Sequence, residues 1–157
     1  MKIKVTWGTG TGNTLLSSFD SALFDAGIAN YNLIPLSSVI PPKSKIEVKK
    51  INLQESKKDF GKRLYVVLSR NCTAKKDASI FAGVGWVMNE KEQKGLFVEH
   101  HGESEKEVET LIKKSLTDMT VYRKDSFGEI NMKITGIKCT GKPVSALVCA
   151  VYKVSKW

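Results

Sequence analysis

The sequence predicts one α+β domain with about seven β-strands and two long helices. Its 157 residues are the usual length of one domain with a core of its own. Two segments repeat apolar residues at helical spacing, and each of them follows segments with the alternation that is typical of strands. Helices that come after strands in both halves of a chain indicate an α+β domain, in which the helices pack on β-sheet.

The first strand and the first helix are predicted within residues 2–26. Apolar and polar residues alternate over residues 2–7, which predicts a half-buried strand. The sequence GTGTG at residues 8–12 then predicts a flexible turn. Apolar residues recur at helical spacing over residues 15–26, with Asn13 or Thr14 as the N-cap.

A strand, a glycine-rich segment and a helix also follow one another in phosphate-binding loops. The dinucleotide-binding fingerprint requires Gly or Ala where Asn13 stands, and the Gly-Lys-Ser/Thr of the P-loop is missing. We therefore favour a plain turn. A nucleotide-binding protein that uses Gly8 to Gly12 stays open as an alternative.

The remaining strands are predicted from alternation and from runs of apolar residues. A lysine-rich exposed loop is expected over residues 43–62, with a short strand near residues 46–48. Thr140 and Gly141 form the turn of an expected hairpin between the last two strands. The predicted strands are residues 28–36, 63–70, 78–88, 95–102, 129–139 and 142–154.

The second helix begins with a capping box. Ser104 is the expected N-cap and Glu107 is the reciprocal residue at the third helical position. The helix continues to about Tyr122, and its apolar stripe is expected to pack in the core.

Composition and charge bear on the class of protein. The formal net charge is +9, but the lysines are dispersed without an aromatic-rich binding motif, so no nucleic acid is expected as a partner. A basic RNA-binding module is kept as an alternative. We find no apolar run of about 18 residues and no secretory signal, so we expect no membrane association and a cytoplasmic protein.

The cysteines and histidines do not suggest a metal site. The three cysteines are far apart and lack C-x-x-C spacing, so buried or incidental thiols are expected. His100 and His101 are adjacent on a predicted strand, where successive side chains point to opposite faces. With no third ligand apparent, we expect no metal.

A pair of serines, Ser37 and Ser38, stands between an apolar run and the pair Pro41-Pro42. The prolines fix their own φ and push Ile40 away from the α region, so the segment should be extended and stiff. If the fold also strains the peptide bond between the serines, the Ser38 hydroxyl could attack the Ser37 carbonyl. The same pattern is also found in a plain turn at a strand edge.

Two blocks of sequence closely resemble the pyruvoyl-dependent arginine decarboxylases. Residues 19–42 read FDSALFDAGIANYNLIPLSSVIPP, with the serine pair of that family followed by a hydrophobic pair and two prolines. Residues 95–102 read GLFVEHHG and resemble its second signature. The resemblance implies a four-layer αββα sandwich that assembles as a homotrimer or a dimer of trimers, with sites between subunits.

The resemblance also implies a self-cleavage. Autocatalytic serinolysis between Ser37 and Ser38 would give a β chain of residues 1–37 and an α chain of residues 38–157, whose first residue becomes a covalent pyruvoyl group. Asn32 would assist by donating its amide N–H to the oxyanion that forms at Ser37.

The implied reaction is the decarboxylation of L-arginine to agmatine and CO₂. The pyruvoyl group derived from Ser38 would form a Schiff base with the substrate and replace PLP, without a metal. Glu99 would be the proton donor, because partial desolvation raises the pKa of a carboxylic acid. Asp20 would reach a neighbouring subunit's site and bind the substrate guanidinium through paired hydrogen bonds. The alternative within the family is a decarboxylase of another basic amino acid.

Overall fold

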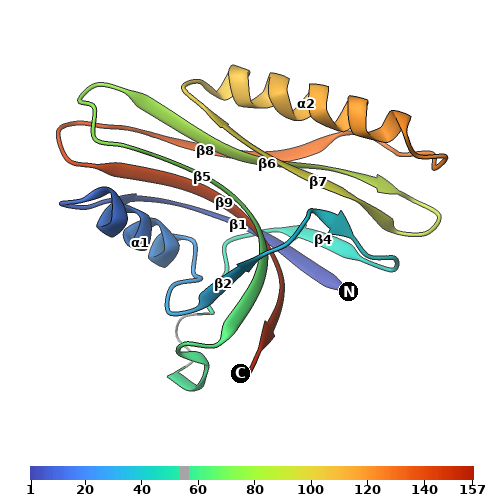
Figure 1. Cartoon of the computed structure of the whole chain (residues 1–157), viewed down its shortest axis with the longest axis horizontal. Helices are drawn as coiled ribbons and strands as arrows, with labels where there is room; N and C mark the ends of the chain where they lie inside the picture. Colours follow the sequence, from blue (N-terminus) through green and yellow to red (C-terminus); the bar gives the residue numbers. More distant parts are fainter. Residues whose placement is uncertain (54–56) are drawn as a thin grey trace.

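Two β-sheets of five and four strands form the centre of the molecule, and the two α-helices pack on them (Figure 1). The structure, a computed structural model, describes residues 1–53 and 57–157. In chain order its elements are β1 (Lys2–Thr11), α1 (Leu15–Asp25), β2 (Asn32–Pro35), β3 (Val39–Ile40), β4 (Lys45–Val48), the 3-10 helix η1 (Lys57–Asp59), β5 (Arg63–Thr73), β6 (Ser79–Asn89), β7 (Lys94–Gly102), α2 (Glu105–Val121), β8 (Asn131–Lys138) and β9 (Val144–Ser155).

The larger sheet has the strand order β2-β5-β9-β1-β4, and the smaller sheet has the order β3-β7-β6-β8. In the larger sheet, β9 is antiparallel to both β1 and β5, whereas the outer strands β4 and β2 are parallel to their neighbours. All the pairs of the smaller sheet are antiparallel. The described residues therefore form nine strands, more than the seven or so that were predicted, and the strand that was not predicted is the two-residue β3, which pairs with β7.

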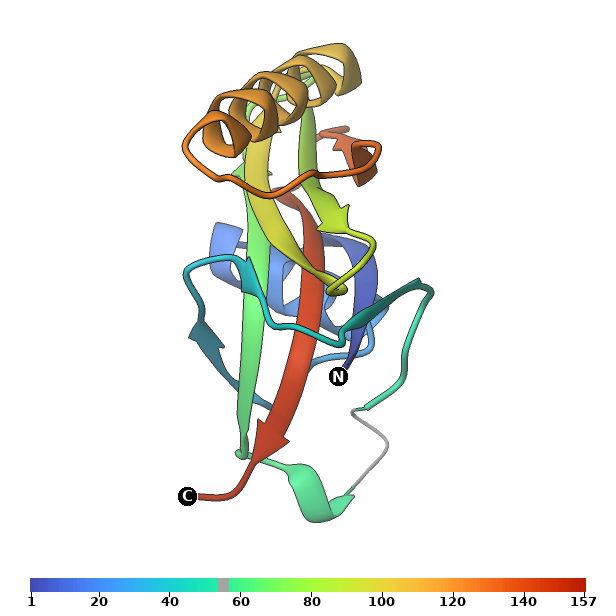
Figure 2. The same ribbon diagram turned by 90° about the vertical axis from the view of Figure 1, so that its right-hand side faces the viewer.

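Four apolar clusters among the described residues hold these elements together. The inner faces of the two sheets share one cluster, and it contains Ile3 of β1, Val67 of β5 and Phe97 of β7, all of which are buried. Helix α1 packs on the other face of the five-stranded sheet. Helix α2 packs on the other face of the four-stranded sheet through Val108, Ile112 and Leu116. Figure 2 shows α2 at one end of the molecule and η1 with the C-terminus at the other.

Residues 8–11 of the glycine-rich segment are part of β1, so the predicted turn at residues 8–12 is wrong. A Cβ atom on Gly8 would lie 2.2 Å from the carbonyl oxygen of Ala22, and one on Gly10 would lie 2.3 Å from its backbone nitrogen. The glycines thus let α1 approach the strand at backbone contact. This packing accounts for them without a bound phosphate.

Both helices begin at the expected caps. Thr14 caps α1 and forms a reciprocal pair with Ser17. Ser104 caps α2 by accepting from the backbone N–H of Glu107. The Glu107 carboxylate, however, accepts from the backbone N–H of Glu103 and not from that of the cap residue, so only half of the predicted capping box is present.

Two strand predictions needed correction. The strand expected over residues 28–36 is limited to Asn32–Pro35, because Asn30 has a positive φ of 70° that interrupts an extended backbone. The expected hairpin of the last two strands is also wrong, since β8 pairs with β6 and β9 pairs with β1 and β5. The turn at Thr140-Gly141 carries the chain from one sheet to the other.

The other predicted strands are confirmed, β4 in the lysine-rich segment among them. Part of that segment, residues 54–56, lies outside the described residues. Neither α-helix in the described parts of the chain is long and apolar enough to cross a membrane.

Candidate active site

The serine pair lies where the chain leaves one sheet and enters the other. Strand β2 belongs to the five-stranded sheet and β3 to the four-stranded sheet. At this crossing Ser38 has a φ of 65°, in the left-handed region, rather than the extended conformation that the prolines predicted. Such a conformation costs a residue with a Cβ about 1–2 kcal/mol. The backbone at the serine pair is therefore strained.

Hydrogen bonds on both sides hold this strained conformation. The backbone N–H of Leu36 donates to the carbonyl oxygen of Val66 at 2.8 Å, which continues the pairing of β2 with β5. The backbone N–H of Phe97 donates to the Ser38 carbonyl oxygen at 2.7 Å. The peptide bond between Ser37 and Ser38 thus lies between the two sheets, and the residues on either side of it are hydrogen-bonded to one sheet each.

Glu99 meets Ser38 at this point. The Ser38 hydroxyl donates to the Glu99 carboxylate, with Oγ 2.9 Å from Oε1 and 2.8 Å from Oε2. Both residues come from the two blocks that resemble the decarboxylase signatures. Glu99 is exposed in the single chain, so this chain alone does not give it the desolvation that was expected from the sequence.

Tyr152 of β9 also lies beside Ser38 and Glu99, and it was not predicted as a site residue from the sequence. Its hydroxyl donates to the carbonyl oxygen of Val39 at 3.1 Å, one residue beyond Ser38. Its ring packs edge-on against Phe97, with 6.1 Å between the ring centroids. Burial, with a smaller contribution from the negative charge of Glu99, raises the pKa of the phenol. Nothing in the alternation of β9 distinguishes this tyrosine from a core residue.

Asn32 is not brought to the serine pair within this chain. It lies at the start of β2, whereas Ser38 lies beyond the end of that strand. Its side-chain amide donates to the carbonyl oxygen of Gly61 at 2.6 Å, and its backbone N–H donates to that of Lys62.

Asp20 is exposed on α1, which packs on the face of the five-stranded sheet opposite to the inner cluster. It has no ion-pair partner among the described residues. The preceding residue, Phe19, lies under the guanidinium of Arg70 and helps to line a cavity of about 410 Å³ that also includes His101. One chain therefore does not bring Asp20 to Ser38.

The two histidines of β7 do point to opposite sides. The Nε2 atom of His100 lies 2.7 Å from the hydroxyl of Ser115 on α2, and burial lowers the pKa of this histidine. His101 lines the cavity beside α1. No group of three or more potential metal-ligating side chains occurs in the part of the chain that the structure describes.

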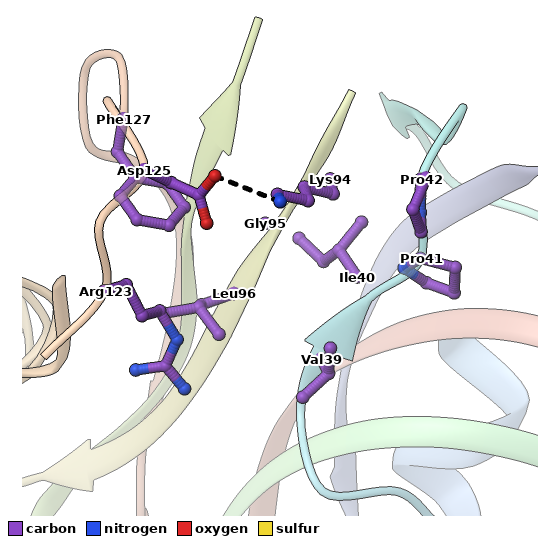
Figure 3. A pocket seen from close by; sticks show the side chains of 10 residues that line it. All are labelled: Val39, Ile40, Pro41, Pro42, Lys94, Gly95, Leu96, Arg123, Asp125 and Phe127. Atoms are coloured by element: carbon purple, nitrogen blue, oxygen red, sulfur yellow. Dashed lines mark ion pairs between the residues drawn. The ribbon is translucent and has the colours of Figure 1, made fainter. Parts of the chain in front are cut away.

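A cavity of about 260 Å³ lies along the segment that follows Ser38 (Figure 3). Its walls are mainly apolar, and its one carboxylate, Asp125, is paired with Lys94 at 3.0 Å. Arg123 adds a second positive charge, across the cavity from Val39 (Figure 3). This cavity therefore does not suit a guanidinium group, because it offers no carboxylate without a cationic partner.

Comparisons with known proteins point to one family. Residues 2–156 match the model of a family described as pyruvoyl-dependent arginine decarboxylase. The chain is 38% identical over 121 residues to a protein of that name from Thermoplasma volcanium, which covers 75% of this chain. It is 37% identical over 109 residues to one from Picrophilus torridus, which covers 68% of this chain.

The matches leave part of each relative uncovered. The matched residues span 65% of the Thermoplasma protein and 59% of the Picrophilus protein, less than two thirds of either. A further relative with the same name, from Nitrosopumilus maritimus, is 40% identical over 84 residues, which are 54% of this chain and 45% of the relative.

Proposed function

The chain belongs to the pyruvoyl-dependent arginine decarboxylase family, and from this premise we propose that it cuts itself between Ser37 and Ser38 and then decarboxylates L-arginine to agmatine and CO₂. One observation carries the proposal. The hydroxyl of Ser38, on a strained backbone, is hydrogen-bonded to the carboxylate of Glu99. Nucleophile, scissile bond and a carboxylate are thereby within reach of one another.

The self-cleavage proceeds through an ester. The Ser38 Oγ attacks the Ser37 carbonyl carbon, the C–N bond breaks, and the hydroxyl proton moves to the released amine. Loss of the Ser38 α-proton and cleavage of the Cβ–Oγ bond then free Ser37 as a carboxylate and leave dehydroalanine at residue 38. This group tautomerises to an imine, water adds and ammonia leaves, which gives a ketone. Strain in the left-handed Ser38 backbone favours the step, because cutting the bond relieves it.

The residues around Ser38 fit a pyruvoyl group at this position. The carbonyl of residue 38 already accepts from the backbone N–H of Phe97, and the Glu99 carboxylate lies beside the side chain of residue 38, whose Cα would become the ketone carbon and whose Cβ would become the methyl group. A pyruvoyl group supplies an electrophilic carbonyl that binds the substrate amine and accepts electrons as CO₂ leaves. It takes the place of PLP, and we propose no metal.

Glu99 moves the proton in catalysis. In the protonated form its carboxyl delivers a proton to the substrate α-carbon after CO₂ has left, and a neighbouring subunit supplies the desolvation that a single chain lacks. Asp20 of an adjacent subunit binds the guanidinium through paired charge-assisted hydrogen bonds. This requirement for two subunits is met by a homotrimer, or a dimer of trimers, of four-layer αββα sandwiches. We propose a cytoplasmic location.

Intact mass and a denaturing gel of the purified protein test the proposal. The wild-type chain is expected to give two fragments, residues 1–37 and 38–157, the larger one blocked and reactive toward borohydride in the presence of arginine. Ser38→Ala should give one uncut chain without activity. Ser37→Ala is the matched control and should still be cut, since only its carbonyl takes part. An uncut, unlabelled wild-type chain would refute the self-cleavage.

A further inference from the structure

Tyr152 occupies an irregular position in β9. In the pairing of β5 with β9, Tyr65 is opposite Lys153 and Val66 is opposite Val151, which leaves Tyr152 as an extra residue in the register. A bulge of this kind redirects the side chains of its strand and is frequent beside active sites.

The bulge changes which face of the sheet each side chain occupies. Before it, Val148 and Ala150 lie in the cluster between the sheets. After it, Val154 belongs to the cluster on the α1 side, although the even-numbered residues before the bulge point the other way. Tyr152 continues the alternation of Val148 and Ala150 and faces the inner cluster, against Phe97, and the bulge then turns the following apolar side chain, Val154, toward α1.

Tyr152 and Phe97 hold two successive carbonyl groups. The Phe97 backbone N–H donates to the carbonyl oxygen of Ser38 at 2.7 Å, and the Tyr152 hydroxyl donates to that of Val39 at 3.1 Å. Strand β3 adds the register pairs Val39 with Leu96 and Ile40 with Gly95. Among these interactions, the hydrogen bond from Tyr152 is the one that a side chain makes, so a substitution can remove it without changing the others.

The hydrogen bond from the Tyr152 hydroxyl to the carbonyl of Val39 becomes more important for ordering this segment once the chain is cut. This step rests on the proposed function, in which residue 38 becomes a chain end. A new terminus gains conformational freedom and is poorly ordered unless something ties it down. We propose that Tyr152 is a positioning residue that anchors the new N-terminal segment, through the carbonyl of Val39, and so keeps residue 38 beside Glu99.

The proposal separates positioning from ordinary packing. The ring of Tyr152 fills space beside Phe97, and phenylalanine in its place would fill the same space. The hydroxyl alone reaches the segment that carries the reactive end. Removal of the hydroxyl should therefore loosen residues 38–40 and leave the core intact.

Tyr152→Phe in the full-length enzyme tests this proposal, with Tyr31→Phe as the matched control. Tyr31 also donates its phenol to a backbone carbonyl, that of Leu53 at 3.2 Å, and lies next to Asp59 rather than the serine pair. Hydrogen exchange followed by mass spectrometry is measured on the peptide that begins at residue 38. The amides of Val39 and Ile40 should exchange about fivefold faster in Tyr152→Phe, as expected for the loss of one neutral hydrogen bond.

Kinetics give a second readout. The kcat for arginine should fall by a similar factor, about fivefold, while KM changes less than about twofold, because the substrate-binding carboxylate is untouched. Tyr31→Phe should match the wild type in both measurements. Unchanged exchange at residues 39 and 40, or an equal effect of Tyr31→Phe, would overturn the anchoring role.

The outcomes also distinguish this proposal from the one on which it rests. If the wild-type chain is never cut, the proposed function fails and the anchor fails with it. If the wild type is cut and active but Tyr152→Phe shows wild-type exchange and a wild-type kcat, only the anchor fails.

Discussion

The Ser38 hydroxyl lies within 2.9 Å of both carboxylate oxygens of Glu99, across a separation of 61 residues. In the proposed self-cleavage, the same carboxylate would hold the hydroxyl before the cut and would stand beside residue 38 after it. One side chain can in this way take part in making the reactive group and in the reaction that the group supports. The predictions below separate these two contributions and test the residues around them.

Glu99→Gln should still be cut between Ser37 and Ser38 but should lose turnover. Glutamine can accept a hydrogen bond from the serine hydroxyl, so the hydroxyl stays in place. It has no acidic proton to deliver, and loss of a general acid typically lowers kcat by about 10²–10⁴-fold. The measurements are intact mass for the cut and CO₂ release for turnover. Glu103→Gln, a change at an exposed residue of the following loop, is the control.

Full activity in Glu99→Gln would remove it as the proton donor. A failure to cut would instead mean that the carboxylate acts as a base toward the serine hydroxyl, beyond holding it.

Asp20→Ala should raise the KM for arginine and leave the cut unaffected. The carboxylate is exposed on α1 without an ion-pair partner among the described residues. It is therefore available to the guanidinium group of a substrate bound at the site of another subunit. Loss of a charge-assisted pair weakens binding by about 1.5–3 kcal/mol, which is a rise in KM of about 10- to 100-fold. Asp118→Ala on the exposed side of α2 is the control. An unchanged KM would exclude Asp20 from the site.

Asn32→Ala distinguishes an oxyanion donor from a residue that fixes the start of β2. If the amide stabilises the oxyanion at Ser37, the rate of self-cleavage should fall by about 10²–10³-fold. The observed hydrogen bond to Gly61 predicts a smaller effect, a lower melting temperature with a nearly normal rate. The time course of the cut, followed by gel, and a thermal melt of the Ser38→Ala precursor decide between the two.

The free energy of unfolding should fall as the pH is lowered from about 7.5 to 5.5, in part because of His100. Burial lowers the pKa of His100 below its ordinary value, so the unfolded chain binds a proton at a higher pH than the folded chain. Stability from this residue is therefore present above the unfolded pKa and lost below it. Urea unfolding at both pH values checks this.

His100→Gln should show a smaller loss of stability over that pH range than the wild type. His101→Gln, a change at the exposed neighbour, is the control for the loss of a histidine from this strand. An identical pH dependence in His100→Gln and the wild type would contradict the role of His100.

Much of the fold could be predicted from local patterns. The caps Thr14 and Ser104, the apolar stripes of both helices and most of the strands follow from side-chain periodicity, because one face of each element must be buried. The turn predicted at Gly8 and Gly10 was wrong. Glycine is needed at these positions because the backbone of α1 packs directly on the strand and leaves no room for a Cβ atom. The expected hairpin failed for a similar reason, as sheet membership depends on pairing with distant strands.

Two blocks of sequence, which carry the serine pair and Glu99, were enough to identify the family and the chemistry to be tested. The three-dimensional packing was needed to find that Ser38 is strained at a crossing between sheets, that its hydroxyl contacts Glu99, and that the Tyr152 hydroxyl reaches the same segment at Val39. Local periodicity specifies which face of an element is apolar. It carries no information on which distant residues become neighbours, because that depends on the pairing and packing of whole sheets.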